Sequence, residues 1–235
     1  MDRLYAIIPA YNEQDNIRQV IRDWYDVIAA TGEESRLVVI DDGSKDDTYK
    51  IMLEEAAGKP ALIALHKDNS GHGATVLYGY RYALENGADF IFQTDSDGQT
   101  LPGEFDLFYR RRHKYNFIIG CRKDRKDGFF RILTNRVLRL VVRMIFSIDL
   151  KDINTPYRLM DRSVIEDCLK YIPKDFNLSN VILTVAAARK GYKGLYIPIT
   201  FRNRQGGKNS INVKKIFMIG WKALKDFCKI EKELR

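Results

Sequence analysis

The stretch "FIFQTDSDGQTLPGEF", residues 90–105, joins an apolar run typical of a buried strand to an acidic turn. Asp95 and Asp97 stand two positions apart and are followed by Gly98 and Gln99. Like charges this close repel each other, so such carboxylates are solvated, hydrogen-bonded to neighbouring backbone, or bridged by a cation. Which of these applies depends on what the rest of the chain brings to the same place.

The first half of the chain alternates short apolar runs with amphipathic stretches. This alternation predicts an α/β protein with a Rossmann-like, mostly parallel central sheet flanked by helices. The expected strands are 3–8, 36–40, 61–65, 90–94 and 116–120, and the expected helices are 14–30, 46–57, 72–86 and 102–113.

The second half is less regular. We expect helices at 129–146, 161–171 and 178–190, a strand at 193–199, and a last amphipathic helix at 213–232. No repeat or Pro/Ser-rich linker interrupts the sequence. The simplest organisation is one domain, residues 1–212, followed by a C-terminal amphipathic helix within 213–235.

Polar segments follow four of the expected strands. Ligands of parallel sheets bind at the carboxyl ends of the strands, which is where these segments fall. They are "PAYNE" (9–13), "DDGSKDDT" (41–48), "KDNSGHGA" (67–74) and "DSDGQ" (95–99).

Composition narrows the classes of partner and compartment. The 39 Lys and Arg residues exceed the 31 Asp and Glu residues, and the net charge of +8 favours nucleotides, phosphates, a membrane surface or nucleic acid. The three cysteines are widely spaced without metal-ligand spacing, so we expect free thiols in a reducing compartment. The first residues contain too short an apolar run for a signal peptide, and no run of about 18 apolar residues predicts a membrane span. A cytoplasmic protein is expected.

Two of the polar segments have structural as well as functional interpretations. In "DDGSKDDT", a tight turn explains Gly43 and a helix cap explains Asp46. Neither explains Asp41, whose carboxylate is a candidate acceptor of hydrogen bonds from a base or ribose. In "NSGHGA", Val76 stands where a dinucleotide fingerprint needs its third glycine, so a glycine-rich turn that opens a helix is favoured.

The "DSDGQ" segment excludes two common interpretations. An EF-hand loop needs glycine where Thr100 stands and glutamate where Asp106 stands. A dehalogenase-type phosphatase needs threonine where Gln99 stands. What remains is a solvated acidic turn or a Mg²⁺ or Mn²⁺ site that carries a nucleoside diphosphate.

The ordered set of motifs resembles one enzyme family. "IIPAYNE", "VVIDDGSKDDT", "NSGHGA", "TDSDGQ" and "GCRKDRKDGFFR" together resemble the inverting family 2 glycosyltransferases of GT-A fold. Within them, the chain is most similar to polyprenyl-phosphate sugar transferases of the dolichol-phosphate mannose synthase type. The resemblance covers about residues 5–212. It implies transfer of a hexose from a UDP- or GDP-sugar to undecaprenyl or dolichyl phosphate, with Mg²⁺ or Mn²⁺.

The resemblance also implies roles for individual residues. The nucleotide pocket would hold Pro9, Tyr11, Glu13 and Asp41, the metal would bind Asp95, Asp97 and Gln99, and Ser96 would lie against the substrate. The donor and acceptor phosphates would contact Arg122, Arg131, Thr134 and Arg204.

The chain departs from the family pattern in three places. The usual Ser-Gly-Phe-Arg is Thr155-Pro156-Tyr157-Arg158, and the loop of Arg204 ends in Asn209-Ser210, which leaves Lys208 to replace a missing lysine. The region in which relatives carry an acidic base, "PKDFNLSNVI" (173–182), has Asp175 as its only acid.

The missing base bears on the acceptor. A sugar hydroxyl must lose a proton in order to attack, whereas a lipid phosphate is already an anion and needs only cations to position it. A polyprenyl phosphate acceptor is therefore favoured over a glycan hydroxyl. Asp152 remains a candidate for a general base. The candidate catalytic residues are Asp97, Arg122, Arg131 and Asp152.

Two helices suit a membrane surface. The first sets Leu133, Val137, Leu140 and Met144 at helical spacing beside Arg136, Arg139 and Arg143. The last carries Lys215, Lys222, Lys225 and Lys229 on its polar side. Peripheral attachment to the cytoplasmic membrane face is expected. The alternatives are packing of these helices on the chain's own domain, in a homo-oligomer, or against a membrane-protein partner. Aromatic–basic RNA-binding signatures are absent, so no nucleic acid partner is expected.

Overall fold

The computed structural model describes residues 2–122, 129–150, 152–202 and 213–234, with the backbone alone for 129–136 and 213–223. These residues form a seven-stranded sheet in the order β3-β2-β1-β4-β6-β5-β7. The strands are β1 (Leu4–Ala10), β2 (Arg36–Asp41), β3 (Leu62–His66), β4 (Phe90–Gln93), β5 (Phe117–Arg122), β6 (Arg158–Asp161) and β7 (Gly194–Ile199).

Parallel pairing dominates the sheet. β1 pairs in parallel with β2 and β4, β2 with β3, and β5 with β7, whereas β6 runs antiparallel to both β4 and β5. Ala10 lies opposite Asp41 in the register of β1 and β2, so the carboxyl ends of these strands meet at one edge. The predicted α/β architecture with a mostly parallel sheet is confirmed.

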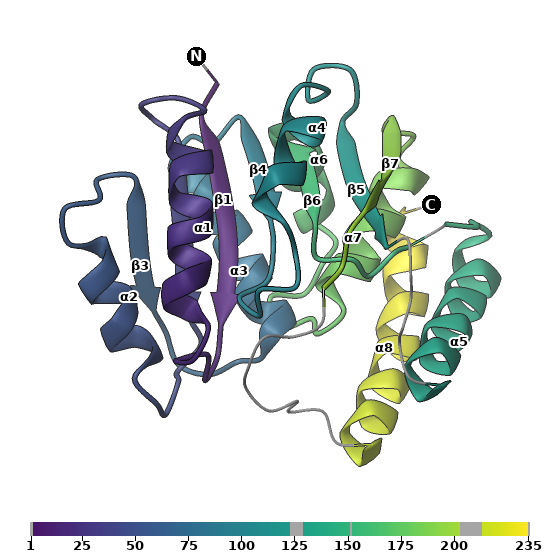
Figure 1. Cartoon of the computed structure of the whole chain (residues 1–235). Helices are drawn as coiled ribbons and strands as arrows, with labels where there is room; N and C mark the ends of the chain where they lie inside the picture. Colours follow the sequence, from purple (N-terminus) through teal and green to yellow (C-terminus); the bar gives the residue numbers. More distant parts are fainter. Residues whose placement is uncertain (1, 123–128, 151, 203–212, 235) are drawn as a thin grey trace.

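Helices cover both faces of the sheet (Figure 1). One face carries α1 (Ile17–Ala29), α2 (Thr48–Ala56) and α4 (Phe105–Tyr109). The other carries α3 (His72–Glu85), α6 (Arg162–Leu169) and α7 (Ser179–Arg189). Helices α5 (Phe129–Phe146) and α8 (Val213–Leu234) lie side by side next to α7.

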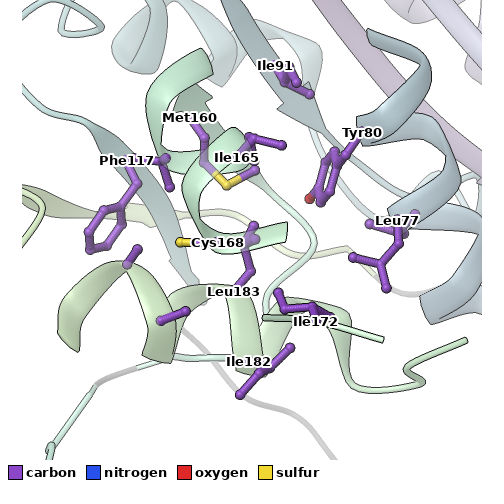
Figure 2. Packing of buried hydrophobic residues seen from close by; sticks show 14 of the residues in the cluster. Leu77, Tyr80, Ile91, Phe117, Met160, Ile165, Cys168, Ile172, Ile182 and Leu183 are labelled. Atoms are coloured by element: carbon purple, nitrogen blue, oxygen red, sulfur yellow. The ribbon is translucent and has the colours of Figure 1, made fainter. Parts of the chain in front are cut away.

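Buried apolar side chains hold these layers together. On α1, residues spaced at helical intervals form a buried stripe that includes Ile17, Ile21, Trp24 and Ile28. On the opposite face, Leu77 of α3, Met160 of β6 and Leu183 of α7 converge on one core (Figure 2). The two apolar faces explain why β1 and β4, in the middle of the sheet, are buried along their whole length.

The last turns of α8 belong to this core. Phe227 and Ile230 are buried, and the ring of Phe227 lies 5.6 Å from that of Phe146 on α5. Glu231 accepts a bond of 2.9 Å from Arg189 on α7. The C-terminal part of the helix thus packs against α5 and α7. Within the described part of the chain, no helix is both long enough and apolar enough to traverse a bilayer.

The sequence analysis missed one strand and predicted one helix wrongly. Strand β6 was not predicted, because its four residues begin with Arg158 and end with Asp161 and show no alternation of apolar and polar side chains. The helix expected over 102–113 is a 3₁₀ turn at Pro102–Glu104 followed by the short α4. The basic run at 110–114 leaves the helix, since like charges one turn apart oppose helix formation.

Glu55 on α2 binds three cations, and two of them, Arg18 and Arg22, lie on α1. It is almost fully buried and accepts bonds from Arg18 (2.8 Å), Arg22 (2.8 Å) and Lys59 (2.7 Å). The hydrogen bond from Arg22, followed by those from Lys59 and Arg18, outweighs desolvation and lowers the pKa of Glu55 to about 2. Because the folded-state pKa is depressed, this stabilisation is present above about pH 4.5 and is lost as the pH falls towards 2.

We expect Glu55→Gln to lower the free energy of unfolding by about 1–2 kcal/mol at pH 7, since solvent around the cations screens part of the interaction. Urea denaturation at pH 7 and at pH 3 measures the difference, which should shrink at the lower pH. Glu54→Gln is the matched control, because Glu54 is half exposed and its single bond to Arg18 contributes little. An equal loss of unfolding free energy at both pH values would contradict the link between this stabilisation and the ionisation of Glu55.

Candidate active site

The acidic turn after β4 is fixed by its own hydrogen bonds. The hydroxyls of Thr94 and Thr100 form a hydrogen bond of 2.6 Å across the turn. Asp97 Oδ1 accepts a hydrogen bond of 3.1 Å from the backbone N–H of Gln99. Gly98 adopts φ 70°, a conformation that favours glycine. The turn therefore holds its carboxylates in place at the carboxyl end of a central strand.

A cavity of about 190 Å³ opens beside this turn. The sequence-predicted residues Asp95, Asp97, Gln99 and Arg122 all line it. The wall is completed by His72 of α3, Phe201 after β7, and two polar segments. Those segments contribute Asn154, Pro156, Asn177, Leu178 and Asn180.

Arg122 and Asp152 meet in a bidentate ion pair. Arg122 Nε donates to Asp152 Oδ2 and Nη2 donates to Oδ1, both at 3.0 Å. The two side chains are 7% and 8% exposed. The Arg122 guanidinium also lies over the ring of Phe201, 5.2 Å from its centroid. The pair links the end of β5 to the loop before β6 at the cavity wall.

His72, the first residue of α3, lies against Asp95 of the acidic turn. Its Nε2 lies 3.0 Å from Asp95 Oδ1. Desolvation disfavours the protonated form of the ring and would lower its pKa. The negative charge of Asp95 outweighs this effect and raises the pKa of His72 above its ordinary 6.5. The histidine carries positive charge at the edge of the acidic turn when it is protonated.

The glycine-rich turn brings His72 to this position. Gly71 has φ 89°, and a Cβ at Gly73 would collide with the carbonyl oxygens of Phe176 and Asn177. The first turn of α3 therefore packs directly on the backbone before α7. This confirms the interpretation of "NSGHGA" as a turn that opens a helix.

Asp42 organises the loop that leads into α3. Its carboxylate accepts from the amides of Ser70 and Gly71 at 2.9 Å each, and from the ammonium of Lys67. Burial alone would raise the pKa of Asp42, but the bonds from Lys67 and Ser70 outweigh it and hold that pKa below its ordinary 3.8.

Asp41 is fully buried at the end of β2. His66 Nδ1 lies 2.7 Å from Asp41 Oδ2, and the amide of Ser44 donates to the carboxylate at 3.2 Å. The ring of His66 is partly exposed and lies 4.8 Å from that of Tyr49. A pair of rings that the sequence analysis missed thus adjoins the predicted nucleotide-binding carboxylate.

The other predicted nucleotide residues lie on the neighbouring strand end. Pro9 is in β1, and Tyr11 and Glu13 follow it. The amide of Glu13 donates to Thr48 Oγ1 at 2.8 Å, which ties this segment to the start of α2. Pro9, Tyr11, Glu13 and Asp41 form a group at the ends of β1 and β2, whereas Ser96 lies buried within the acidic turn.

Three predicted phosphate-binding residues cannot be placed. Arg131 and Thr134 fall within α5, but their side chains lie outside the described residues. Arg204 also lies outside them. The roles of these residues stay predictions.

A comparison with protein-family models decides the class. Residues 5–169 match the model described as glycosyl transferase family 2. The chain belongs to this family. The resemblance predicted from the ordered motifs is therefore confirmed, and the chain is a glycosyltransferase.

Characterised relatives of this family 2 transferase share most of its length. It is 28% identical over 221 residues to the undecaprenyl-phosphate mannosyltransferase of Micrococcus luteus, covering 89% of this chain and 88% of the relative. It is 26% identical over 223 residues to the polyprenol monophosphomannose synthase of Mycolicibacterium smegmatis, covering 91% and 83%.

Solved structures confirm the GT-A fold of this transferase. Glucosyl-3-phosphoglycerate synthase from Mycobacterium tuberculosis, crystallised with Mn²⁺ and uridine-diphosphate-glucose, superposes with a TM-score of 0.67 at 16% identity. The match covers 97% of this chain and 79% of the other.

Sequence reasoning missed part of the candidate site of this glycosyltransferase. His72 lies inside a motif at a strand end, so its position could have identified it. Asn154 lies in the loop before β6, a strand that was itself not predicted, and no pattern in the sequence points to it.

Proposed function

We propose that the chain transfers a hexose from a nucleoside diphosphate sugar to a polyprenyl phosphate, with inversion, at the cytoplasmic face of a membrane. The observation that carries this proposal is the cavity that Asp95, Asp97, Gln99 and Arg122 line together. The first three offer ligands for a divalent cation, and Arg122 offers a bidentate donor for a phosphate.

The residues of the acidic turn fit Mg²⁺ or Mn²⁺. Both cations prefer oxygen ligands, which the two carboxylates and the Gln99 amide oxygen provide. Gln99 Nε2 donates to the carbonyl of Arg202 at 2.8 Å, which leaves its oxygen as the metal-binding atom. Within the described part of the chain, no three His, Cys, Asp or Glu side chains form a metal cluster. An incomplete protein shell suits a metal that the substrate diphosphate also coordinates.

The bound cation would neutralise the charge that develops on the leaving diphosphate. The similarly folded synthase has been crystallised with Mn²⁺ and a nucleotide sugar, which supports this part of the proposal. An acceptor phosphate oxygen would attack the anomeric carbon from the face opposite the diphosphate, whose bond to the sugar breaks. The electron pair of that bond leaves with the diphosphate.

The ion pair between Arg122 and Asp152 supports a phosphate as the acceptor. Asp152 is held by two bonds from Arg122, so its carboxylate acts first as an anchor for the guanidinium. A phosphate acceptor is already ionised and needs a positioned cation, which Arg122 provides. The relatives named undecaprenyl-phosphate mannosyltransferase and polyprenol monophosphomannose synthase favour the same class of acceptor.

The outer face of α5 supports contact with a membrane. Val137, Leu140 and Met144 are 52%, 55% and 66% exposed and recur at helical spacing. Arg139 and Arg143 lie on the same helix. Apolar side chains beside cations suit the headgroup region of a bilayer, where the lipid acceptor resides.

With purified enzyme, Mn²⁺ and radiolabelled UDP-glucose or GDP-mannose, we expect label in an organic-extractable, mild-acid-labile product only when vesicles contain undecaprenyl phosphate. The requirement should be all-or-none, since the lipid phosphate is the attacking group. Label that enters a water-soluble oligosaccharide while the lipid phosphate stays inert would refute the lipid acceptor and favour a glycan hydroxyl.

A pair of variants tests the membrane face in the same assay. Leu140→Glu should lower transfer in vesicles about tenfold, because one inserted apolar side chain is replaced by a charge. Leu53→Glu is the matched control, since Leu53 is 50% exposed on α2 at the other end of the sheet (Figure 1). Equal effects of the two substitutions would remove α5 from the membrane contact.

A further inference from the structure

We propose that three asparagines, Asn154, Asn177 and Asn180, recognise the hydroxyl groups of the donor's hexose and select an uncharged sugar. The inference rests on the proposed function, because it requires a nucleoside diphosphate sugar in the cavity. It goes further by naming the groups that read the sugar and the class of sugar they accept.

The position of the three amides fits the sugar. All three line the cavity that also holds Asp95 and Asp97. The sugar is bonded directly to the diphosphate, whose cation these carboxylates would bind. The part of the cavity next to the carboxylates is therefore where the hexose has to lie.

Asn180 provides the sharpest indication. Its side chain is buried, and its Oδ1 has no hydrogen-bond partner among the described residues. An unmatched buried acceptor costs free energy until a donor reaches it. A sugar hydroxyl brings such a proton, whereas an ionised phosphate does not. The cavity wall at Asn180 thus suits the hexose better than either phosphate.

A buried arginine fixes two of the asparagines. Arg158 is 1% exposed, and its Nη1 donates to the carbonyl of Asn180 at 2.9 Å. Its Nη2 donates to the carbonyls of Ile153 at 3.3 Å and Thr155 at 2.8 Å, which flank Asn154. One guanidinium thus holds both segments that carry these amides. Arg158 is a positioning residue for the sugar site.

The third asparagine is fixed from the other side. A side chain at Gly73 would collide with the carbonyl of Asn177, so the start of α3 packs against that backbone. All three amides consequently stand on segments with defined neighbours, as a specific binding site requires.

The charges around the amides define the class of sugar. Amide groups both donate and accept, which matches neutral hydroxyls. A uronate carboxylate would share the cavity with the carboxylates of Asp95 and Asp97, which would repel it. An uncharged hexose is the ligand that this wall accommodates.

The test is calorimetric titration with Mn²⁺ and four probes: UDP-glucose, UDP-glucuronic acid, GDP-mannose, and the matching free nucleotide, UDP or GDP. Wild type should bind an uncharged hexose donor, and bind UDP-glucuronic acid at least about tenfold more weakly than UDP-glucose if UDP is the nucleotide. Asn180→Ala should weaken binding of the preferred donor about tenfold and leave the free nucleotide unchanged.

The same variant separates a substrate role from a structural one. Because Oδ1 makes no bond among the described residues, Asn180→Ala should lower the free energy of unfolding only slightly. Asn86→Ala, an exposed asparagine at the end of α3, is the matched control and should change neither affinity. Asn177→Ala tests the same site independently if Asn180→Ala does not fold.

Three outcomes overturn the proposal. Unchanged donor affinity in both Asn180→Ala and Asn177→Ala would remove the amides from the sugar site. An equal loss for the donor and the free nucleotide would assign them to the nucleotide instead. If wild type binds no nucleotide sugar at all, the proposed function fails and this inference fails with it.

Discussion

Asp97→Ala should lower sugar transfer by at least about 10²-fold, the scale of losing one group that stabilises charge in a transition state. Asp97 lines the cavity next to Asp95 and Gln99, so its loss removes one of the two carboxylates available to a cation. Initial rates over a Mn²⁺ titration measure the effect. Asp97→Asn, which keeps an oxygen ligand without the charge, should lose less and recover in part at high Mn²⁺.

The control for this prediction is a carboxylate on α4. Asp106 forms an exposed pair with Arg110, and such pairs contribute little, so Asp106→Ala should keep full activity. Circular dichroism melts of both variants should match wild type, because the hydroxyls of Thr94 and Thr100 also hold the turn, through their hydrogen bond of 2.6 Å. Wild-type activity that persists in excess EDTA would contradict a metal at this site.

The strand ends were predictable because they combine two independent signals. Strands β1 to β4 are short apolar runs, and each is followed by polar residues that a buried loop could not accommodate. Asp95 and Asp97 were singled out in this way, whereas the role of Gln99 came from the family resemblance. Their convergence with Arg122 followed from the resemblance, since β5 is separated from β4 in the sheet by a strand that the sequence did not reveal.

The unpredicted part of the candidate site depends on β6. This strand is antiparallel and short, and it enters the sheet between β4 and β5 from a later part of the chain. Its first residue, Arg158, is a charged side chain that the fold buries with carbonyl partners. Sequence patterns place arginine at the surface by default, so neither the strand nor the position of Asn154 could be inferred from them.

The second large effect concerns the ion pair of Arg122 and Asp152. Arg122→Gln should lower kcat/KM by at least about 10²-fold, because it removes the bidentate donor proposed for the phosphate. It should also lower the free energy of unfolding by about 3–5 kcal/mol, since it leaves the Asp152 carboxylate buried without its cation. Urea denaturation measures this second effect on the same preparation.

A double-mutant cycle decides what Asp152 does. If Asp152 serves to hold Arg122, then Asp152→Asn and Arg122→Gln act on one unit, and the double variant should lose about as much activity as Arg122→Gln alone. The shape of the pH–rate profile should stay the same in Asp152→Asn. A base that acts independently predicts the opposite: losses that multiply, and disappearance of the acidic limb of the profile.

Arg122→Lys completes the cycle by separating charge from geometry. Lysine keeps the positive charge beside Asp152 but cannot form the two parallel bonds that Arg122 makes at 3.0 Å. We therefore expect most of the stability to return and most of the transfer activity to stay lost. Recovery of activity together with stability would show that the site needs only a charge at this position. The acceptor phosphate would then be held by other groups, and the predicted phosphate contacts Arg131 and Arg204 would be the next residues to replace.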